Sequence, residues 1–140
     1  MLAVLAAAAV ALALAAPSLG QRGSTVGART SEYGTILFDG RGFVLYVFTH
    51  DARGQSKCTD ACAEAWPPFL ARGRLLAGKG AAAKLLGTTR RADGTRQITY
   101  AGRPLYYYRG DRTPGQILCQ DVVEYGGRWL VVRPSGTPVR

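Results

Sequence analysis

Three cysteines, one histidine and two tyrosine–aspartate sets are the side chains of this 140-residue chain whose spacing could support chemistry. Cys58, Cys62 and Cys119 can form one intramolecular disulfide and leave one thiol, and their positions leave all three pairings open. A bridge from Cys119 to either of the others would close a loop of about 60 residues and stabilise the fold by about 4 kcal/mol. A Cys58–Cys62 bridge would close only a small local loop.

Redox activity is the first chemistry to weigh for these cysteines. Cys58 follows Lys57, and Cys62 lies at the start of a predicted short helix; a cation and a helix N-terminus both stabilise a thiolate. However, the Cys-x3-Cys spacing differs from the two-residue spacing of thioredoxin motifs, and no βαβ pattern surrounds it. We therefore favour a structural cross-link over a redox site.

Metal binding and hydrolysis have weaker support. The three cysteines with His50 have the composition of a Cys3His zinc site, but in an oxidising compartment such cysteines usually form a disulfide. A single histidine excludes any site that needs two imidazoles. His50 beside Asp51 is typical of a solvated turn, because a catalytic triad is defined by spatial arrangement and not by sequence proximity. We expect no catalytic site, no metal site and no cofactor.

A series of motifs occurs twice along the chain. Segments 45–51 and 105–111 share the pattern Leu-Tyr-x-aromatic-x-x-Asp, and each is followed by Gly-Gln-x-x-Cys and then by one of the two tryptophans, Trp66 and Trp129. An ordered series of this kind indicates a duplicated half-domain with a pseudo-twofold axis.

Six residues of the repeated motif are candidates for a ligand-binding site: Tyr46, Phe48, Asp51, Tyr106, Tyr108 and Asp111. At the period of a strand, the first two share one face, and the two later tyrosines repeat that arrangement. The alternative is that the rings form a small core and that the carboxylates cap the turns after the strands. We favour core and turn caps, because no catalytic group accompanies these residues.

The elements that must position these residues are mainly β: a small antiparallel β domain built from two similar halves, with one or two short helical insertions. Alternating and β-branched runs predict strands over 35–38, 44–49, 88–92, 95–100, 105–108, 117–125 and 128–132. Hairpin turns are predicted over 39–42, at Asp93-Gly94 and at Gly126-Gly127, and another turn at Ala101-Gly102. Short helices are predicted over 60–65 and 79–86.

The N-terminal segment has the pattern of an export signal. The first 16 residues are uncharged and almost all Ala, Leu and Val, fewer than the roughly 18–20 that a spanning helix needs. We predict a signal peptide over 1–20, cleaved after Ala15, Ala16 or Gly20. The signal peptide would be followed by a flexible leader over 21–31 and a β domain over 32–134, with pseudo-repeats at about 33–70 and 88–134. The last residues, 135–140, are predicted to form a disordered tail. No cysteine follows the apolar run, so a periplasmic or extracellular protein without a lipid anchor is expected.

The net charge of +9 comes from 18 Lys and Arg against 9 Asp and Glu. The basic residues are scattered, with no compact run beyond Arg90-Arg91, so we expect no nucleic-acid partner. A basic exported domain could instead attract anionic envelope polymers or membrane head groups.

The repeated motifs resemble the secreted repeat family of unknown function, which is recognised by a Tyr-x4-Asp motif and often occurs as tandem repeats in bacterial lipoproteins. The matching segments are 45–48 with Asp51, 58–62 with 66–68, 93–100 with 102–106, and 126–127 with Trp129. The resemblance covers nearly all of the chain from Tyr33 to Pro134.

What the resemblance implies is an exported domain with no assigned activity. In that family the Cys-x3-Cys pair looks constant, which implies a Cys58–Cys62 bridge, whereas the duplication makes Cys58 and Cys119 equivalent and favours a bridge near the pseudo-dyad. We expect a non-catalytic binding or structural module. The alternative is a redox or electron-transfer accessory protein that uses Cys58, Cys62 and the aromatic cluster.

Overall fold

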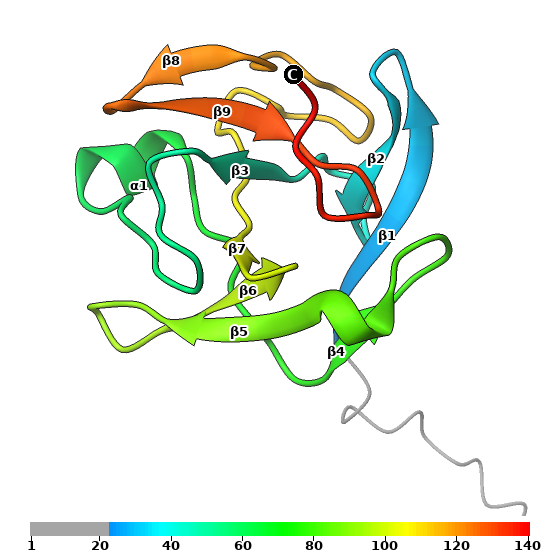
Figure 1. Ribbon diagram of the computed structural model, residues 1–140, viewed down its shortest axis with the longest axis horizontal. Helices are drawn as coiled ribbons and strands as arrows, with labels where there is room; N and C mark the ends of the chain where they lie inside the picture. The colour runs from blue at the N-terminus through cyan, green and yellow to red at the C-terminus, as the bar shows by residue number, and fades with distance from the viewer. Residues whose placement is uncertain (1–22) are drawn as a thin grey trace, which may run out of the picture.

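The computed structural model describes residues 23–140, so the predicted signal peptide and the first two residues of the predicted leader lie outside the described residues. In this part of the chain, short strands form three small sheets, with one short α-helix on the outside (Figure 1). The strands are β1 (Ser24–Ser31), β2 (Gly34–Asp39), β3 (Tyr46–Phe48), β4 (Leu75–Ala77), β5 (Leu86–Arg90), β6 (Arg96–Tyr100), β7 (Arg103–Pro104), β8 (Val122–Glu124) and β9 (Gly127–Val131). The helical elements among the described residues are α1 (Ala61–Ala65) and the 3-10 turn η2 (Ala83–Leu85).

The sheets have the strand orders β2-β1-β4, β3-β9-β8 and β5-β6-β7. Every pairing is antiparallel except that of β1 with β4. The prediction of a mainly β, antiparallel-rich domain with short helical insertions is confirmed. The helix predicted over 79–86 is reduced to η2, and β4 was not predicted.

Two hairpin turns use residues with positive φ. Ala101 and Gly102 (φ 51° and 77°) join β6 to β7, as predicted, and Tyr125 and Gly126 (φ 55° and 83°) join β8 to β9. Positive φ at both central positions is the type I′ geometry that fits the twist of adjacent strands. The second turn lies one residue earlier than predicted, because Gly127 pairs with Glu124 in the ladder.

The prediction of a flexible leader over 21–31 is wrong for the residues that the structure describes. They form β1, which pairs with β2 on one side and β4 on the other. Ser24 is buried, and its hydroxyl donates to the carbonyl of Arg72. Small polar residues carry no strand periodicity, but their backbone completes a ladder between two neighbours.

The predicted disordered tail is also ordered in the structure. The Val139 N–H donates to the Val131 carbonyl over 2.9 Å, and Val132 forms a bridge with Pro138. The Val139 side chain is buried against the core. Its burial and these backbone contacts hold the tail against the end of β9.

Strand β3 separates two clusters of buried side chains. Tyr46 and Phe48 pack into a cluster rich in aromatic rings, whereas Val47 points into a mainly aliphatic cluster with Leu105 and Leu130. Because successive side chains of a strand point to opposite faces, this placement confirms the predicted alternation.

The two halves are interlocked. β3, from the first half, pairs with β9, from the end of the second half. Conversely, segment 68–70 of the first half forms bridges to Tyr106 and Gln97 of the second half. The backbone of each half therefore pairs with that of the other, and the two motif tyrosines meet where the halves cross.

Candidate functional site at the junction of the two halves

The centre of the junction is a direct pairing of the two motif tyrosines. The Tyr46 N–H donates to the Tyr106 carbonyl, and the Tyr106 N–H donates to the Tyr46 carbonyl, both over 2.9 Å. This reciprocal pair is the geometry that a twofold axis produces in an antiparallel ladder. Both side chains are fully buried.

The tyrosine hydroxyls then cross between the halves. Tyr46 donates to Asp111 Oδ2 over 2.7 Å, and Tyr106 donates to Asp51 Oδ2 over 2.8 Å. Each motif aspartate therefore binds the tyrosine of the other half and not the tyrosine five residues before it. The Tyr-x4-Asp spacing places the carboxylate past the strand end, where the partner phenol reaches it.

The second oxygen of each carboxylate holds a loop. Asp51 Oδ1 accepts the Lys57 N–H over 2.6 Å, and Asp111 Oδ1 accepts the Leu118 N–H over 2.9 Å. Lys57 and Leu118 each precede a cysteine, so the two contacts are equivalent in the two halves. The carboxylates thus connect the buried phenols to the loops that carry Cys58 and Cys119.

Burial controls the protonation of this cluster. It raises the pKa of Tyr46 and of Tyr106 far above the ordinary value, and the facing aspartate raises each further. Burial also raises the pKa of Asp51 and of Asp111, although the hydrogen bonds that these carboxylates accept oppose the shift. The phenols are therefore neutral donors, suited to holding carboxylates and not to acting as nucleophiles.

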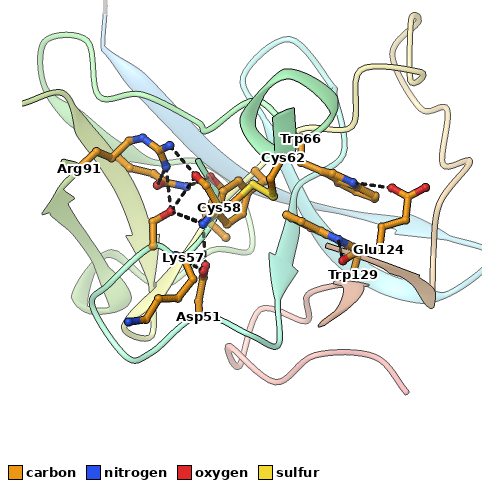
Figure 2. Close-up of a disulfide and its surroundings, with 12 residues drawn as sticks. Asp51, Lys57, Cys58, Cys62, Trp66, Arg91, Glu124 and Trp129 are labelled. Carbon is orange, nitrogen blue, oxygen red and sulfur yellow. Dashed lines mark hydrogen bonds between the residues drawn. A yellow bond between two sulfur atoms is a disulfide. The ribbon is translucent and has the colours of Figure 1, made fainter. Parts of the chain in front are cut away.

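A column of stacked rings lies beside the tyrosines. Trp66 and Trp129 stack with their ring centroids 4.0 Å apart and their planes 5° from parallel. Phe48 stacks on Trp129 at 4.1 Å, and Tyr108 covers Trp66 at 4.8 Å. Figure 2 shows the two indoles face to face, with their N–H groups directed at Glu124.

The edges of the column are also related by the pseudo-dyad. Tyr46 meets Trp66 edge-on at 5.2 Å, and Tyr106 meets Trp129 edge-on at 5.1 Å. Edge-to-face and stacked pairs each contribute about 0.5–1.5 kcal/mol beyond the area they bury. The repeated aromatic residues therefore form one shared core.

The disulfide is local. Cys58 and Cys62 are bridged, with their Cα atoms 5.2 Å apart, and both side chains are buried (Figure 2). This is the pair implied by the family resemblance, and the bridge between halves does not form. Cys119 is a free, half-buried thiol near Tyr108, and burial raises its pKa.

The histidine and the cysteines do not assemble with other groups into a metal or hydrolytic centre in the part of the chain that the structure describes. Within 23–140, no three His, Cys, Asp or Glu side chains are grouped to hold a metal ion. His50 is exposed and lies against the Phe48 ring at 5.7 Å. Asp51, its neighbour, is directed to Tyr106 and Lys57 instead.

The six candidate binding residues come together, but mostly inside the molecule. Tyr46, Tyr106, Phe48 and Asp111 are buried, and Asp51 and Tyr108 are half-buried. A cavity of about 190 Å³ beside them is lined by only two of the six, Phe48 and Asp51. Most of the surface of these six side chains is therefore covered by the rest of the protein.

Sequence patterns missed a third tyrosine–aspartate contact, at a wider cleft of about 650 Å³. The Tyr107 hydroxyl donates to Asp39 Oδ2 over 2.8 Å, and the Arg41 Nε donates to the same oxygen over 3.1 Å. Arg72 also lines this cleft. Asp39 ends strand β2, and Tyr107 lies between the motif residues Tyr106 and Tyr108. The only signal in the sequence was strand alternation, which directs Tyr107 to the face opposite to that of its two neighbours.

Sequence patterns also missed the role of Arg91, whose side chain is buried beside the disulfide loop (Figure 2). Its guanidinium donates to Ser56 Oγ and to the Cys58 carbonyl. In the sequence, the dipeptide Arg90-Arg91 is typical of an exposed, charged surface. No local pattern therefore indicates that the Arg91 side chain is buried.

Comparison with known proteins yields one match. The family model described as "Secreted repeat of unknown function" matches residues 27–69 and 87–133, which are the two interlocked halves. No curated protein matches significantly, and no solved structure does. Among the described residues, the helices are too short or too polar to cross a bilayer. The two matched stretches cover most of the chain, which therefore belongs to this family of secreted repeats and is an exported protein.

Proposed function

We propose that this protein is a non-catalytic module of the cell envelope whose basic surface binds anionic polymers or membrane head groups. The observation that carries the proposal is the excess of cations on the surface, where six of the nine carboxylates are also exposed. Three carboxylates, those of Asp39, Asp51 and Asp111, accept hydrogen bonds from tyrosine hydroxyls at buried or half-buried positions. By contrast, every lysine and every arginine except Arg91 is exposed among residues 23–140.

Few of these cations are neutralised by neighbours. Within the described residues there are two salt bridges, Arg41–Asp39 and Arg128–Asp121. A surface with many unpaired cations attracts anionic polymers over a distance of about 8–10 Å at physiological salt. The attraction is spread over both halves and needs no single deep site.

A non-catalytic role is supported by the state of the motif residues. The two phenols are protonated and fully buried, and the two carboxylates already accept two hydrogen bonds each. Neutral, buried phenols are poor nucleophiles, and each carboxylate already holds one tyrosine and one loop in place.

The experiment is co-sedimentation with vesicles of phosphatidylglycerol or of phosphatidylcholine over a series of salt concentrations. We expect binding to the anionic vesicles at low salt, a steep loss with added salt, and competition by soluble poly-glutamate. Replacing exposed cations (Arg74→Gln with Lys84→Gln) should weaken binding, and the matched change of an exposed acid, Glu32→Gln, should strengthen it. Equal binding to both lipids, or binding that salt does not alter, would contradict the proposal.

Export is proposed to follow cleavage within 15–20, giving a periplasmic or extracellular protein without a lipid anchor. The apolar, uncharged segment 1–16 and the absence of a cysteine just after it support this. The mass of the mature protein recovered from the producing cell tests it. A mature mass that includes the first 16 residues, or one that includes an acyl chain, would refute it.

The redox alternative has one observation in its favour. The disulfide is close to Trp66. The ring of Trp66 stacks on Trp129, and its backbone N–H donates to the Cys62 carbonyl. Against it, both bridged cysteines are buried, so an attacking thiol cannot reach them easily. Counting thiols after mild reduction of the native protein separates the two: a count of one supports a structural bridge, and a count of three supports redox cycling.

A further inference from the structure

Arg91 departs from the charge pattern of the rest of the molecule. Its side chain is only 8% exposed, whereas the other described arginines are on the surface. Neither salt bridge of the described residues involves it. A buried cation without a direct carboxylate partner is costly, so its environment calls for an explanation.

The hydrogen bonds of Arg91 all go to neutral oxygens. Nη1 donates to Ser56 Oγ over 2.9 Å and to Gln97 Oε1 over 2.8 Å, and Nη2 donates to the Cys58 carbonyl over 2.7 Å. The Nε atom is enclosed and has no partner. A guanidinium has five N–H donors, so the N–H of Nε and one N–H of Nη2 are unused.

The hydrogen-bond network of Arg91 leads to a carboxylate only through two hydroxyls. Ser56 Oγ lies 2.7 Å from the Tyr106 hydroxyl, which donates to Asp51 over 2.8 Å. This chain orients the dipoles around the guanidinium, but it leaves the positive charge without an anion in contact. The hydrogen bonds to Ser56, Gln97 and Cys58 also fix the guanidinium in one position, so little entropy is lost when a ligand binds.

A cavity of about 310 Å³ has Arg91 among its lining residues. It is lined by Arg90, Arg91, Gln55, Ser56, Thr59 and Ala92. Two cations, two hydroxyls and one amide therefore face it, and its lining contains no carboxylate. The wider cleft of Arg41 and Arg72 differs in this respect, because Asp39 stands among its cations.

We propose that this cavity binds a phosphate group, with Arg91 as the fixed cation and Arg90 as the exposed cation at its mouth. Arginine suits this ligand because its planar fork matches the oxygens of phosphate, and the exposed Thr59 hydroxyl can donate to a further oxygen. The phosphate supplies the anion that Arg91 lacks. The proposal is independent of general attraction to anionic surfaces, since it concerns one position with defined donors.

The first test is titration of the folded protein with inorganic phosphate and with glycerol phosphate, followed by NMR. We expect saturable shifts confined to residues around Arg91, Ser56 and Thr59, with chloride at equal ionic strength giving none. Saturation by inorganic phosphate shows that the phosphate group alone suffices, and saturation by glycerol phosphate alone shows that a phosphate ester, as in a polymer or lipid head group, is needed. No saturable shift with either compound would overturn the proposal.

The second test uses two variants with the same change of charge on the same hairpin. Arg90→Gln alters an exposed residue of the cavity and should weaken phosphate binding about tenfold, the effect of losing one charge-assisted contact. Arg96→Gln alters an exposed residue outside it, whose guanidinium bonds Thr88, and should leave the affinity unchanged. Equal weakening by both variants would show non-specific attraction and refute the site while leaving the proposed function intact.

Arg91 itself is tested by replacement with lysine, which keeps the charge but loses the planar fork. We expect Arg91→Lys to weaken phosphate binding further than Arg90→Gln does. If Arg91→Lys does not fold, Thr59→Val gives the second measurement, because Thr59 is exposed and lines the cavity. If neither Thr59→Val nor Arg90→Gln changes the affinity for phosphate, the anion binds elsewhere and the proposed site is wrong.

Discussion

Tyr46 and Tyr106 exchange both backbone hydrogen bonds with each other, and each donates its hydroxyl to the aspartate of the other half. The repeated motif therefore works across the duplication and not within one copy. In one copy alone, the tyrosine hydroxyl would lack its aspartate acceptor. The backbone N–H and C=O of the same tyrosine would also lack their partners. This explains why two copies are interlocked in one domain.

The crossed contacts predict a specific pattern in double-mutant cycles. Tyr46→Phe combined with Asp111→Ala should show a coupling of about 1–2 kcal/mol in the free energy of unfolding, because the two groups share a buried hydrogen bond. Tyr46→Phe combined with Asp51→Ala, within one copy, should show less than about 0.5 kcal/mol. Denaturant unfolding of the single and double variants measures both. Coupling within the copy but not across it would contradict the structure.

The raised pKa of Asp111 predicts how the stability depends on pH. Because its pKa in the folded state lies above that in the unfolded state, the folded protein binds the proton more tightly. The stability that this group contributes is fully present below the unfolded pKa of about 4 and is lost as the pH rises through the folded pKa. Relative to Asp111→Asn, the wild type should therefore gain stability as the pH falls from 7 to about 4.

Urea unfolding of both proteins at the two pH values gives the measurement. The comparison isolates Asp111, since asparagine does not titrate and the other carboxylates are the same in both. A wild type that loses stability relative to the variant in acid would mean that hydrogen bonds from Tyr46 and Leu118 outweigh the effect of burial.

The stacked tryptophans predict a spectroscopic signature. With centroids 4.0 Å apart, the indoles of Trp66 and Trp129 should couple and give a paired positive and negative band in circular dichroism. Either Trp66→Phe or Trp129→Phe should abolish the whole couplet, because it needs both rings. Thermal unfolding of each variant serves as a control that the fold is kept. Half of the signal remaining in either variant would show that the rings do not couple.

The cysteines predict which thiol reacts in the native protein. Cys119 alone should be labelled by an alkylating reagent, and slowly at pH 7, because burial raises its pKa and only the thiolate reacts. Labelling should accelerate as the pH rises towards and beyond the ordinary pKa of a cysteine thiol. Mass mapping of the labelled peptide measures it. Modification of Cys58 or Cys62 without reductant would contradict the bridge.

The small loop closed by the bridge predicts a modest contribution to stability. Replacing both bridged cysteines by alanine should lower the free energy of unfolding by about 2 kcal/mol. The loss is modest because a short loop restricts the denatured chain only a little. The loop is also held by the contact of Asp51 with the Lys57 N–H, so the variant should remain folded. A matched change of the free thiol, Cys119→Ala, should cost less. An unfolded bridge variant would give the disulfide a larger role than the geometry supports.

The sequence by itself determined the local features of this protein. Alternation along 46–48 placed Tyr46 and Val47 on opposite faces, and Gly102, which adopts positive φ without strain, marked the turn that it forms with Ala101. These features depend on neighbours a few residues apart, so composition and period are sufficient to predict them. The duplicated motif also indicated two halves, which the family match places at 27–69 and 87–133.

Only the tertiary structure decided the partners. The hydrogen bonds of the tyrosine hydroxyls join residues 65 and 55 positions apart, and no local pattern indicates which aspartate each phenol reaches. The same holds for the strand β1, whose polar residues are ordered by the backbones of β2 and β4. It also holds for Arg91, whose guanidinium donates to residues of both halves. These contacts exist because the two halves interlock, and their energies depend on burial and distance, which are properties of the folded chain and not of any segment of it.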